Sequence, residues 1–118
     1  MMNQKEAQDT LISRIAYSYN KNAYDGKDHV LEINFTDIKK SYQIFLGKDE
    51  SKIYTDESLT ATTRIDTPYS VWASIANGEM SAGEALGKQL YTVSGDFSFM
   101  INWNKYFNSN TCVNNENQ

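Results

Sequence analysis

Residues 60–78 read TATTRIDTPYSVWASIANG, a stretch that changes from strand chemistry to helix chemistry at its middle. Its first six residues are rich in β-branched side chains, which favour an extended backbone. The run Asp66-Thr67-Pro68 is a helix start signal, because polar residues cap a first turn and proline fits the first helical position. Apolar residues then recur at helical spacing until Asn77 and Gly78, which readily adopt the conformation that ends a helix. The stretch therefore predicts a strand followed directly by a helix.

Upstream of this stretch, the pattern predicts one helix and a meander of strands. Apolar residues between positions 6 and 19 recur near the 3.6-residue period of an amphipathic helix. Apolar and polar residues alternate over 29–35 and again over 42–46, as in strands that are buried on one face. A short third strand is expected at 53–54, because a polar turn precedes it.

Downstream, the sequence predicts two more helices around a last strand. Ser81 and Glu84 match a capping box, so a short helix should run from there to about residue 89. Residues 90–93 return to strand chemistry, and Gly95 and Asp96 end that strand and begin a last helix that continues to Phe107. The predicted fold class is therefore α/β, in the α+β sense.

Length and charge limit the organisation and the partners of the protein. A chain of 118 residues with 40% hydrophobic and 13% aromatic residues predicts one folded domain, which we place at residues 1–107. Residues 108–118 have almost nothing to bury and are expected to form a polar, disordered tail. A net charge of -4 with only two arginines predicts no nucleic-acid partner, because a phosphate backbone needs a basic surface.

Cysteine content and hydropathy predict the compartment. The single cysteine, Cys112, permits no disulfide framework and no zinc cluster, so we expect a cytoplasmic protein with no metal and no cofactor. No apolar run approaches the ~20 residues of a spanning helix, and the first residues lack the pattern of a signal peptide. We expect no stable membrane insertion.

The sequence shows no motif for catalysis. The only histidine, His29, opens a predicted strand in a polar context, and we expect it to be a structural residue at the surface. No glycine pattern has the spacing of a phosphate-binding loop. One alternative stays open: a small pocket can catalyse an isomerisation with a single carboxylate, and Asp66 or Asp96 would serve, although both positions also fit helix caps.

Large apolar residues are concentrated in the C-terminal half of the chain. A well-packed core explains them, and so does a ligand pocket. The last helix should have two apolar faces, one with Phe97, Met100, Ile101 and Asn104, the other with Phe99, Trp103, Tyr106 and Phe107.

Three short motifs, Gly78-Glu79-Met80, Ala85-Leu86 and the run TVSGD at 92–96 preceded by Tyr91, resemble the sterol-carrier-protein-2 lipid-binding family, in its bacterial branch. The resemblance implies a five-stranded, mostly antiparallel sheet with helices packed on one face, enclosing an apolar tunnel. It implies non-catalytic binding or transfer of a fatty acid, an acyl thioester or a sterol-like molecule. Family members often carry Gly-Lys-Leu before the last strand, whereas this chain has Lys88-Gln89-Leu90.

The resemblance also implies, by position, which residues contact the ligand. The expected ligand-binding residues are Trp72, Ile75, Leu86, Tyr91, Val93, Phe97, Met100, Ile101 and Asn104. Tyr91 or Asn104 would hold a polar head group. The alternative is an accessory interaction or oligomerisation module that works with a separate enzyme or as a homodimer, in which Trp103, Tyr106 and Phe107 would form the partner surface.

Overall fold

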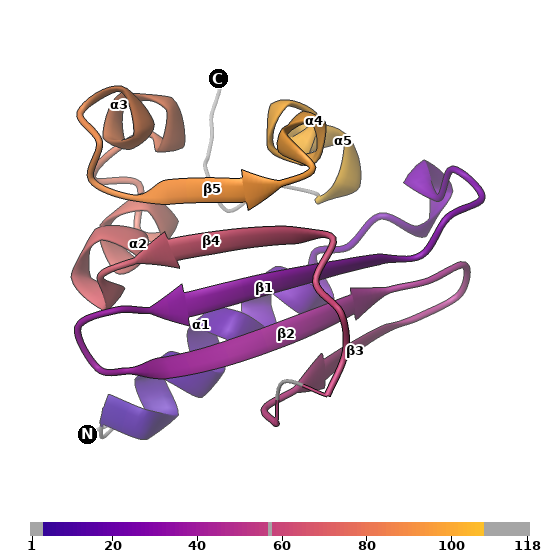
Figure 1. Cartoon of the computed structure of the whole chain (residues 1–118), viewed down its shortest axis with the longest axis horizontal. Helices are drawn as coiled ribbons and strands as arrows, with labels where there is room; N and C mark the ends of the chain where they lie inside the picture. Colours follow the sequence, from indigo (N-terminus) through magenta and orange to yellow (C-terminus); the bar gives the residue numbers. More distant parts are fainter. Residues whose placement is uncertain (1–3, 57, 108–118) are drawn as a thin grey trace.

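The computed structural model describes residues 4–56 and 58–107, which form a five-stranded sheet in the order β3-β2-β1-β4-β5 together with several short helices (Figure 1). The strands are β1 (His29–Phe35), β2 (Lys40–Leu46), β3 (Ser51–Tyr54), β4 (Thr63–Thr67) and β5 (Thr92–Gly95). The helices are α1 (Gln4–Tyr17), the 3-10 turn η1 (Lys21–Ala23), α2 (Tyr69–Ala76), α3 (Ala82–Gly87), α4 (Phe97–Ile101) and α5 (Trp103–Tyr106). The tail predicted at 108–118 lies outside the described residues.

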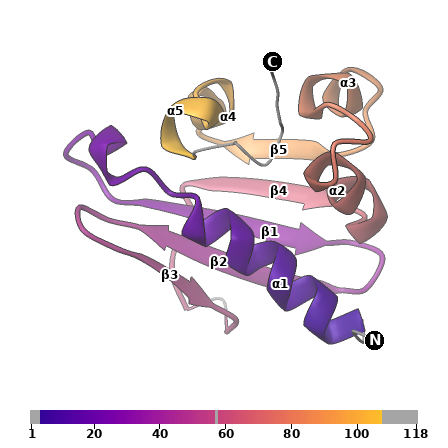
Figure 2. The same ribbon diagram turned by 180° about the vertical axis from the view of Figure 1, so that it is seen from behind.

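The sheet is mostly antiparallel, as predicted. β1 pairs with β2, β2 with β3 and β4 with β5 in antiparallel ladders, while β1 and β4 run parallel in the centre. Ile33 lies opposite Tyr42 on one side and opposite Ile65 on the other, so the three central strands present one continuous apolar face. That face is buried, and α1 lies across it (Figure 2).

The other face of the sheet is polar and is crossed by the connection between β3 and β4 (Figure 1). Arg64 bridges Glu32 at 3.0 Å and Asp66 at 2.9 Å. The Gln43 amide binds the backbone of Leu59, accepting from its N–H at 3.0 Å and donating to its carbonyl at 2.7 Å. Gln43 therefore holds the connection against the sheet, while Arg64 joins β4 to β1.

The prediction that Asp66 caps a helix is wrong. Asp66 follows Ile65 in β4, so it points to the polar face, away from α2, and pairs with Arg64. The start of α2 is capped by Asp37 in the β1–β2 turn, whose Oδ1 accepts the Tyr69 N–H at 2.9 Å. Pro68 stands one position before the first helical residue.

Two other predicted caps are confirmed. Ser81 Oγ accepts the Glu84 N–H at 2.9 Å and begins α3, and Asp96 Oδ1 accepts the Ser98 N–H at 3.0 Å and begins α4. Gly95, just before that cap, has a φ of +84°, and a Cβ there would lie 2.5 Å from the Thr62 carbonyl oxygen. Glycine is therefore needed where β5 turns into α4.

The last helix was expected to be continuous, but it breaks at Asn102 into α4 and α5. Phe99 of α4, Tyr106 of α5 and Phe107 are buried, whereas Phe97 of α4 is exposed. Burying these large rings removes the most apolar surface from water, so they take the inner positions in preference to the smaller side chains of the other face.

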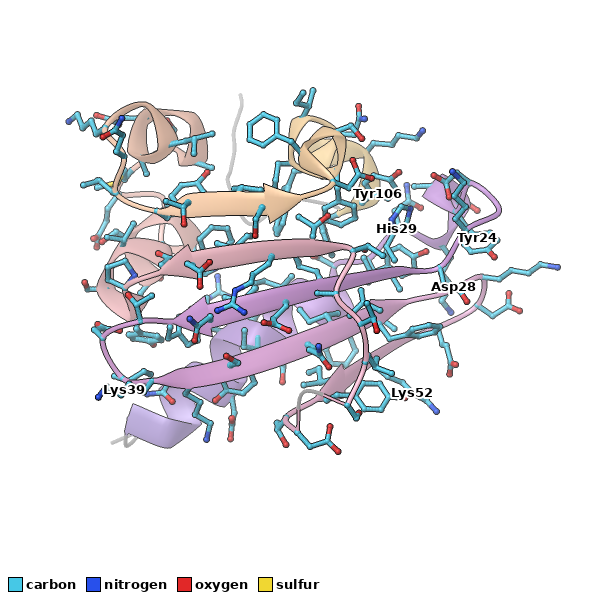
Figure 3. The ribbon with its side chains drawn as sticks, in the orientation of Figure 1. Tyr24, Asp28, His29, Lys39, Lys52 and Tyr106 are labelled. Atoms are coloured by element: carbon cyan, nitrogen blue, oxygen red, sulfur yellow. The ribbon has the colours of Figure 1, made fainter. Side chains whose placement is uncertain are left out.

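His29 is buried, so the prediction of a surface position is wrong. Its ring centroid lies 5.4 Å from those of Phe99 and Tyr106, and Figure 3 shows His29 and Tyr106 side by side at the start of β1. Asp25 Oδ2 lies 3.4 Å from His29 Nε2 and accepts the Tyr106 hydroxyl at 3.3 Å. His29, Phe99, Tyr106 and Phe107 form what we call the aromatic cluster, which closes this end of the core.

Candidate functional site

A pocket of about 330 Å³ lies between α1, α2, α3 and the α4–α5 pair, on the side of the sheet seen in Figure 2. This volume is near the lower end of the ~300–1,000 Å³ range typical of ligand pockets. The lining comes from every one of these helices and from the start of the last strand: Leu11, Arg14, Ile15, Ser18, Trp72, Ile75, Ala76, Ala82, Gly83, Leu86, Tyr91, Phe97, Met100, Ile101, Trp103 and Phe107.

One wall of the pocket is rigid and aromatic. Trp72 meets Tyr91 edge to face, with ring centroids 5.6 Å apart, and meets Trp103 in the same manner at 5.8 Å. The Tyr91 hydroxyl donates to the Ala82 carbonyl at 3.0 Å, which fixes this ring against α3. Burial raises the pKa of Tyr91, so its side chain stays neutral at physiological pH.

The hollow exists because α3 presents small residues to it. Ala82 and Gly83 form the first turn of that helix and line the pocket. A Cβ built on Gly83 would meet no atom within 4 Å, so the space beside it is open. A larger side chain at Gly83 would occupy the volume that a ligand needs.

The mouth of the pocket is formed by α4. Phe97 and Ile101 line the pocket but are 46% and 73% exposed. Phe99, on the opposite face of the same helix, is 1% exposed and anchors α4 in the aromatic cluster. This face of α4 was predicted to point into the pocket, but Phe97 and Ile101 lie at its opening.

The part of the lining that comes from α1 and the residue after it is both apolar and polar. Leu11 and Ile15 contribute apolar surface, while Arg14 and Ser18 bring polar groups to the lining. The Ser18 hydroxyl donates to the Ile15 carbonyl at 2.8 Å. Arg14 is exposed and forms no ion pair within the described part of the chain.

The pocket lining is mainly apolar. As far as the structure describes it, the lining contains no aspartate, glutamate, histidine, cysteine or lysine. Tyrosine can also transfer a proton, and the hydroxyl of Tyr91, which lines the pocket, donates to the Ala82 carbonyl. Asp96 is engaged as the cap of α4, where hydrogen bonds from Ser98 lower its pKa, and Asp66 lies on the far face of the sheet. Residues 4–56 and 58–107 contain no acidic, histidine or cysteine cluster that could hold a metal ion.

The structure brings most of the predicted ligand-binding residues to this pocket. Those that line it are Trp72, Ile75, Leu86, Tyr91, Phe97, Met100 and Ile101. Val93 is partly buried against the core and is not part of the lining, and the side chain of Asn104 lies outside the described residues. Whether the lining residues contact a ligand stays a prediction.

The sequence did not predict that α1 and the residue after it contribute to the pocket lining. Leu11, Arg14, Ile15 and Ser18 follow the spacing of one helical face, which is the signal that could have identified them. That spacing shows that the face packs against something, but it does not show that its neighbour is a hollow.

The predicted partner surface on the last helix is wrong. Tyr106 and Phe107 are 6% and 1% exposed. Trp103 lines the pocket and packs on Phe107, with ring centroids 4.4 Å apart. Their spacing places them on the same face as Phe99, and this face packs on the core.

The model of the SCP-2 sterol transfer family matches residues 9–108 of this chain. Among curated proteins, none matches the chain by sequence.

Solved structures share the fold at low sequence identity. Sterol Carrier Protein 2 Like 2 from Aedes aegypti is 18% identical, with a TM-score of 0.64 over 86% of this chain and 96% of that one. The palmitated form of the same mosquito protein is 16% identical, with a TM-score of 0.54 over 82% of this chain and 89% of that one. The sec-alkylsulfatase Pisa1 from Pseudomonas sp. is 15% identical, with a TM-score of 0.66 over 79% of this chain. This chain spans only 15% of the sulfatase.

Proposed function

This chain belongs to the SCP-2 sterol transfer family, and from that membership and from the pocket we propose that it binds a single-chain lipid with an anionic head group. The chain carries no proton-transfer chemistry in this proposal: the ligand enters and leaves unchanged. The observation that carries the proposal is an apolar pocket whose lining includes Arg14, an exposed cation that forms no ion pair with the other described residues.

The size and lining of the pocket support an acyl chain. Each methylene that moves from water into an apolar site contributes about 0.8 kcal/mol, so a long tail binds without any directional contact. A volume near the lower end of the ligand-pocket range favours one flexible chain over a rigid multi-ring sterol. Met100 can adjust to chains of different length, because its side chain is unbranched and flexible.

Arg14 supports an anionic head group. A guanidinium binds a carboxylate, sulfate or phosphate through two parallel hydrogen bonds, which neutral head groups cannot provide. Tyr91, the head-group candidate from the sequence, donates its hydroxyl proton to Ala82 and lies against α3. In this proposal, the carboxylate of a fatty acid lies at Arg14 and its tail extends into the apolar part of the pocket.

The neighbours are compatible with this ligand class. One solved relative in fold is a palmitated protein, and another is an alkylsulfatase of which this fold covers a small part. The alternative of an accessory module loses the surface expected for it, because Tyr106 and Phe107 are buried. Within the described residues, no helix has the length and apolarity needed to cross a membrane.

Native mass spectrometry of gently purified protein, followed by competition with a fluorescent fatty acid, tests the proposal. The wild-type chain should prefer a fatty acid over the fatty alcohol of the same length by about tenfold, since a charge-assisted bidentate contact contributes roughly 1.5–3 kcal/mol. Arg14→Gln should remove that preference and keep alcohol binding. Lys48→Gln, an exposed cation in the β2–β3 turn, is the matched control and should keep the preference.

Two results would count against the proposal. A chain that rejects fatty acids altogether would remove the lipid-binding function. A chain that binds acid and alcohol equally, before and after Arg14→Gln, would remove the anionic head group and leave an apolar ligand.

A further inference from the structure

We propose that the buried side-chain amide of Gln8 is a second polar contact for the ligand, and that the preferred ligand is a fatty acid with a hydroxyl group along its tail. This inference rests on the proposed lipid-binding function and deepens it, because it adds a polar group to the tail that the pocket receives.

Gln8 is a buried polar residue without a hydrogen bond. It lies in α1 and is 5% exposed. Within the described part of the chain, its amide has no hydrogen-bond partner. Burying an amide without partners destabilises a fold, so this position needs an explanation. Every other buried polar side chain of the described residues has a hydrogen-bond partner: His29, Glu32, Gln43, Thr63 and Thr67.

The position of Gln8 on α1 extends the face that lines the pocket. Leu11, Ile15 and Ser18 belong to the lining, and Gln8 continues their spacing of three and four residues toward the start of the helix. The N-terminal half of α1 runs beside α2, whose Ile75 also lines the pocket (Figure 2). Gln8 is not itself part of the lining, so a ligand that extends beyond Leu11 reaches its amide.

A trapped water molecule explains this amide less well than a ligand group does. A buried water needs about two to four polar partners. The neighbours of Gln8 at three and four positions along α1 are Leu11 and Ile12, and both are apolar. A water beside Gln8 would therefore lack partners on the face of α1 that packs inward.

The chemistry of an amide selects a hydroxyl group. A glutamine side chain offers both a donor and an acceptor, and a hydroxyl group can donate as well as accept, so it can bind either end of the amide. An unsubstituted hydrocarbon tail can do neither. Gln8 is already out of water in the folded chain, so a ligand hydroxyl gives it a partner without further desolvation of the protein.

The spacing between Gln8 and Arg14 places this hydroxyl group away from the carboxylate. The two residues are six positions apart on α1, which corresponds to about 9 Å along the helix axis. With the carboxylate at Arg14, a hydroxyl group in the middle of a long tail can reach Gln8, whereas one beside the carboxylate cannot. The ligand class is therefore a long fatty acid that is hydroxylated within its tail.

Ricinoleic acid and oleic acid differ only in a hydroxyl group in the middle of the chain, so competition of each with a fluorescent fatty acid tests the proposal. The wild-type chain should bind ricinoleic acid about fivefold more tightly, the effect of roughly one hydrogen bond. Gln8→Met keeps an unbranched side chain and removes the amide, so it should lose this preference and bind oleic acid like the wild type. Gln89→Met is the matched control and should keep the preference, because Gln89 is exposed and does not line the pocket.

Urea unfolding without added fatty acid gives an independent readout. Gln8→Met replaces an unpartnered amide by an apolar side chain of similar length, so its unfolding midpoint should equal or exceed that of the wild type. A lower midpoint would show that the amide has a hydrogen-bond partner in the folded chain, and it would overturn the inference.

Two binding results would also overturn the inference and leave the proposed function in place. In the first, the wild-type chain binds both acids with equal affinity. In the second, the preference for ricinoleic acid persists in Gln8→Met, so another group recognises the hydroxyl. A wild-type chain that binds neither acid would instead remove the proposed function, and this inference with it.

Discussion

The aromatic cluster and the pocket share Phe107 and are both rich in aromatic residues, yet one is filled and the other is hollow. On α4, Phe99 belongs to the cluster and Phe97 to the pocket. In the cluster, Phe99 stacks on Tyr106 with ring centroids 4.7 Å apart and meets Phe107 edge to face at 6.0 Å. Across the pocket, Phe97 and Met100 are opposed by the small first turn of α3. Apolar composition does not decide between core and binding site; the size of the opposing side chains does.

The two regions also differ in their hydrogen bonds. The cluster is held by the Asn20 N–H, which donates to the Tyr106 carbonyl at 2.7 Å, and by the Tyr106 hydroxyl, which donates to Asp25 at 3.3 Å. Around the pocket, the comparable bond from Tyr91 stays within one wall, because it ends on Ala82 of α3. The cluster should therefore carry stability and the pocket should carry binding.

The largest expected effect is on stability. Phe99→Ala should lower the free energy of unfolding by about 3–5 kcal/mol, because it opens a cavity in the aromatic cluster. Phe97→Ala, on the exposed face of the same helix, should lower it by less than ~1 kcal/mol. Urea unfolding measures both values. Equal losses would mean that the two faces of α4 are equally packed.

The next effect is on binding. Gly83→Phe should fill the pocket and weaken fatty-acid binding at least tenfold, about 1.4 kcal/mol, while the fold is kept because nothing lies within 4 Å of the new Cβ. Gly87→Phe is the matched control in the same helix: its Cβ also meets open space, and Gly87 does not line the pocket. Fluorescent fatty-acid titration measures both variants. Equal weakening by both would show that the effect comes from α3 as a helix and not from the pocket.

A smaller effect is expected from backbone strain beside the pocket. Gln89, which follows α3, has a φ of 59°, a region in which a side chain is strained. Gln89→Gly should therefore raise the free energy of unfolding by about 0.5–1 kcal/mol in urea, whereas Gln89→Ala should give no gain. A loss of stability in the glycine variant would show that the strain is already relieved by local contacts.

The smallest effect is a pH dependence in the cluster. Burial opposes ionisation of Asp25, but hydrogen bonds from the Lys27 N–H, His29 and Tyr106 outweigh it and lower the pKa of this carboxyl below 3.8. A native pKa below the unfolded value stabilises the fold above the unfolded pKa, and this stabilisation is lost as the pH falls through the native pKa.

Asp25→Asn should therefore lower stability at pH 7, and the difference from the wild type should close as the pH falls below 3.8. Solvent screens this exposed site, so the expected difference is a few tenths of a kcal/mol. Thermal melts at pH 7 and at a pH below 3.8 measure this difference, with Asp49→Asn in the exposed β2–β3 turn as the control. If the stability difference between Asp25→Asn and the wild type widened at low pH, the lowered pKa of Asp25 would be contradicted.

Local signals in the sequence predicted most of the elements. The alternation of β1 and β2, and the caps Ser81 and Asp96, depend on residues within a few positions of one another, so they could be recognised without the fold. The cap of α2 could not be recognised in this way, because Asp37 lies 32 residues before Tyr69, whose N–H donates to it. The burial of His29 likewise depends on Phe99, which reaches it only in the folded chain.

The pocket was predicted less completely than the fold. The family likeness placed Trp72, Tyr91 and Met100 near a ligand, and the structure lines the pocket with them. Periodicity could not place Arg14, because an amphipathic helix shows which face is covered and not what covers it. The two faces of the last helix could be distinguished from the sequence, but which of them packs on the sheet could not, because both are apolar.

The parallel pairing of β1 with β4 has a consequence for synthesis on the ribosome. β1 and β2 are joined by a short turn, so this hairpin can form as soon as residue 46 has emerged. The other edge of β1 has no partner until Thr63–Thr67 has been synthesised. During that time β1, which is the central strand of the finished sheet, is an unprotected edge strand. The nascent chain is then most open to mispairing with a neighbour, and a pause in translation between residues 46 and 63 should promote aggregation more than a pause elsewhere.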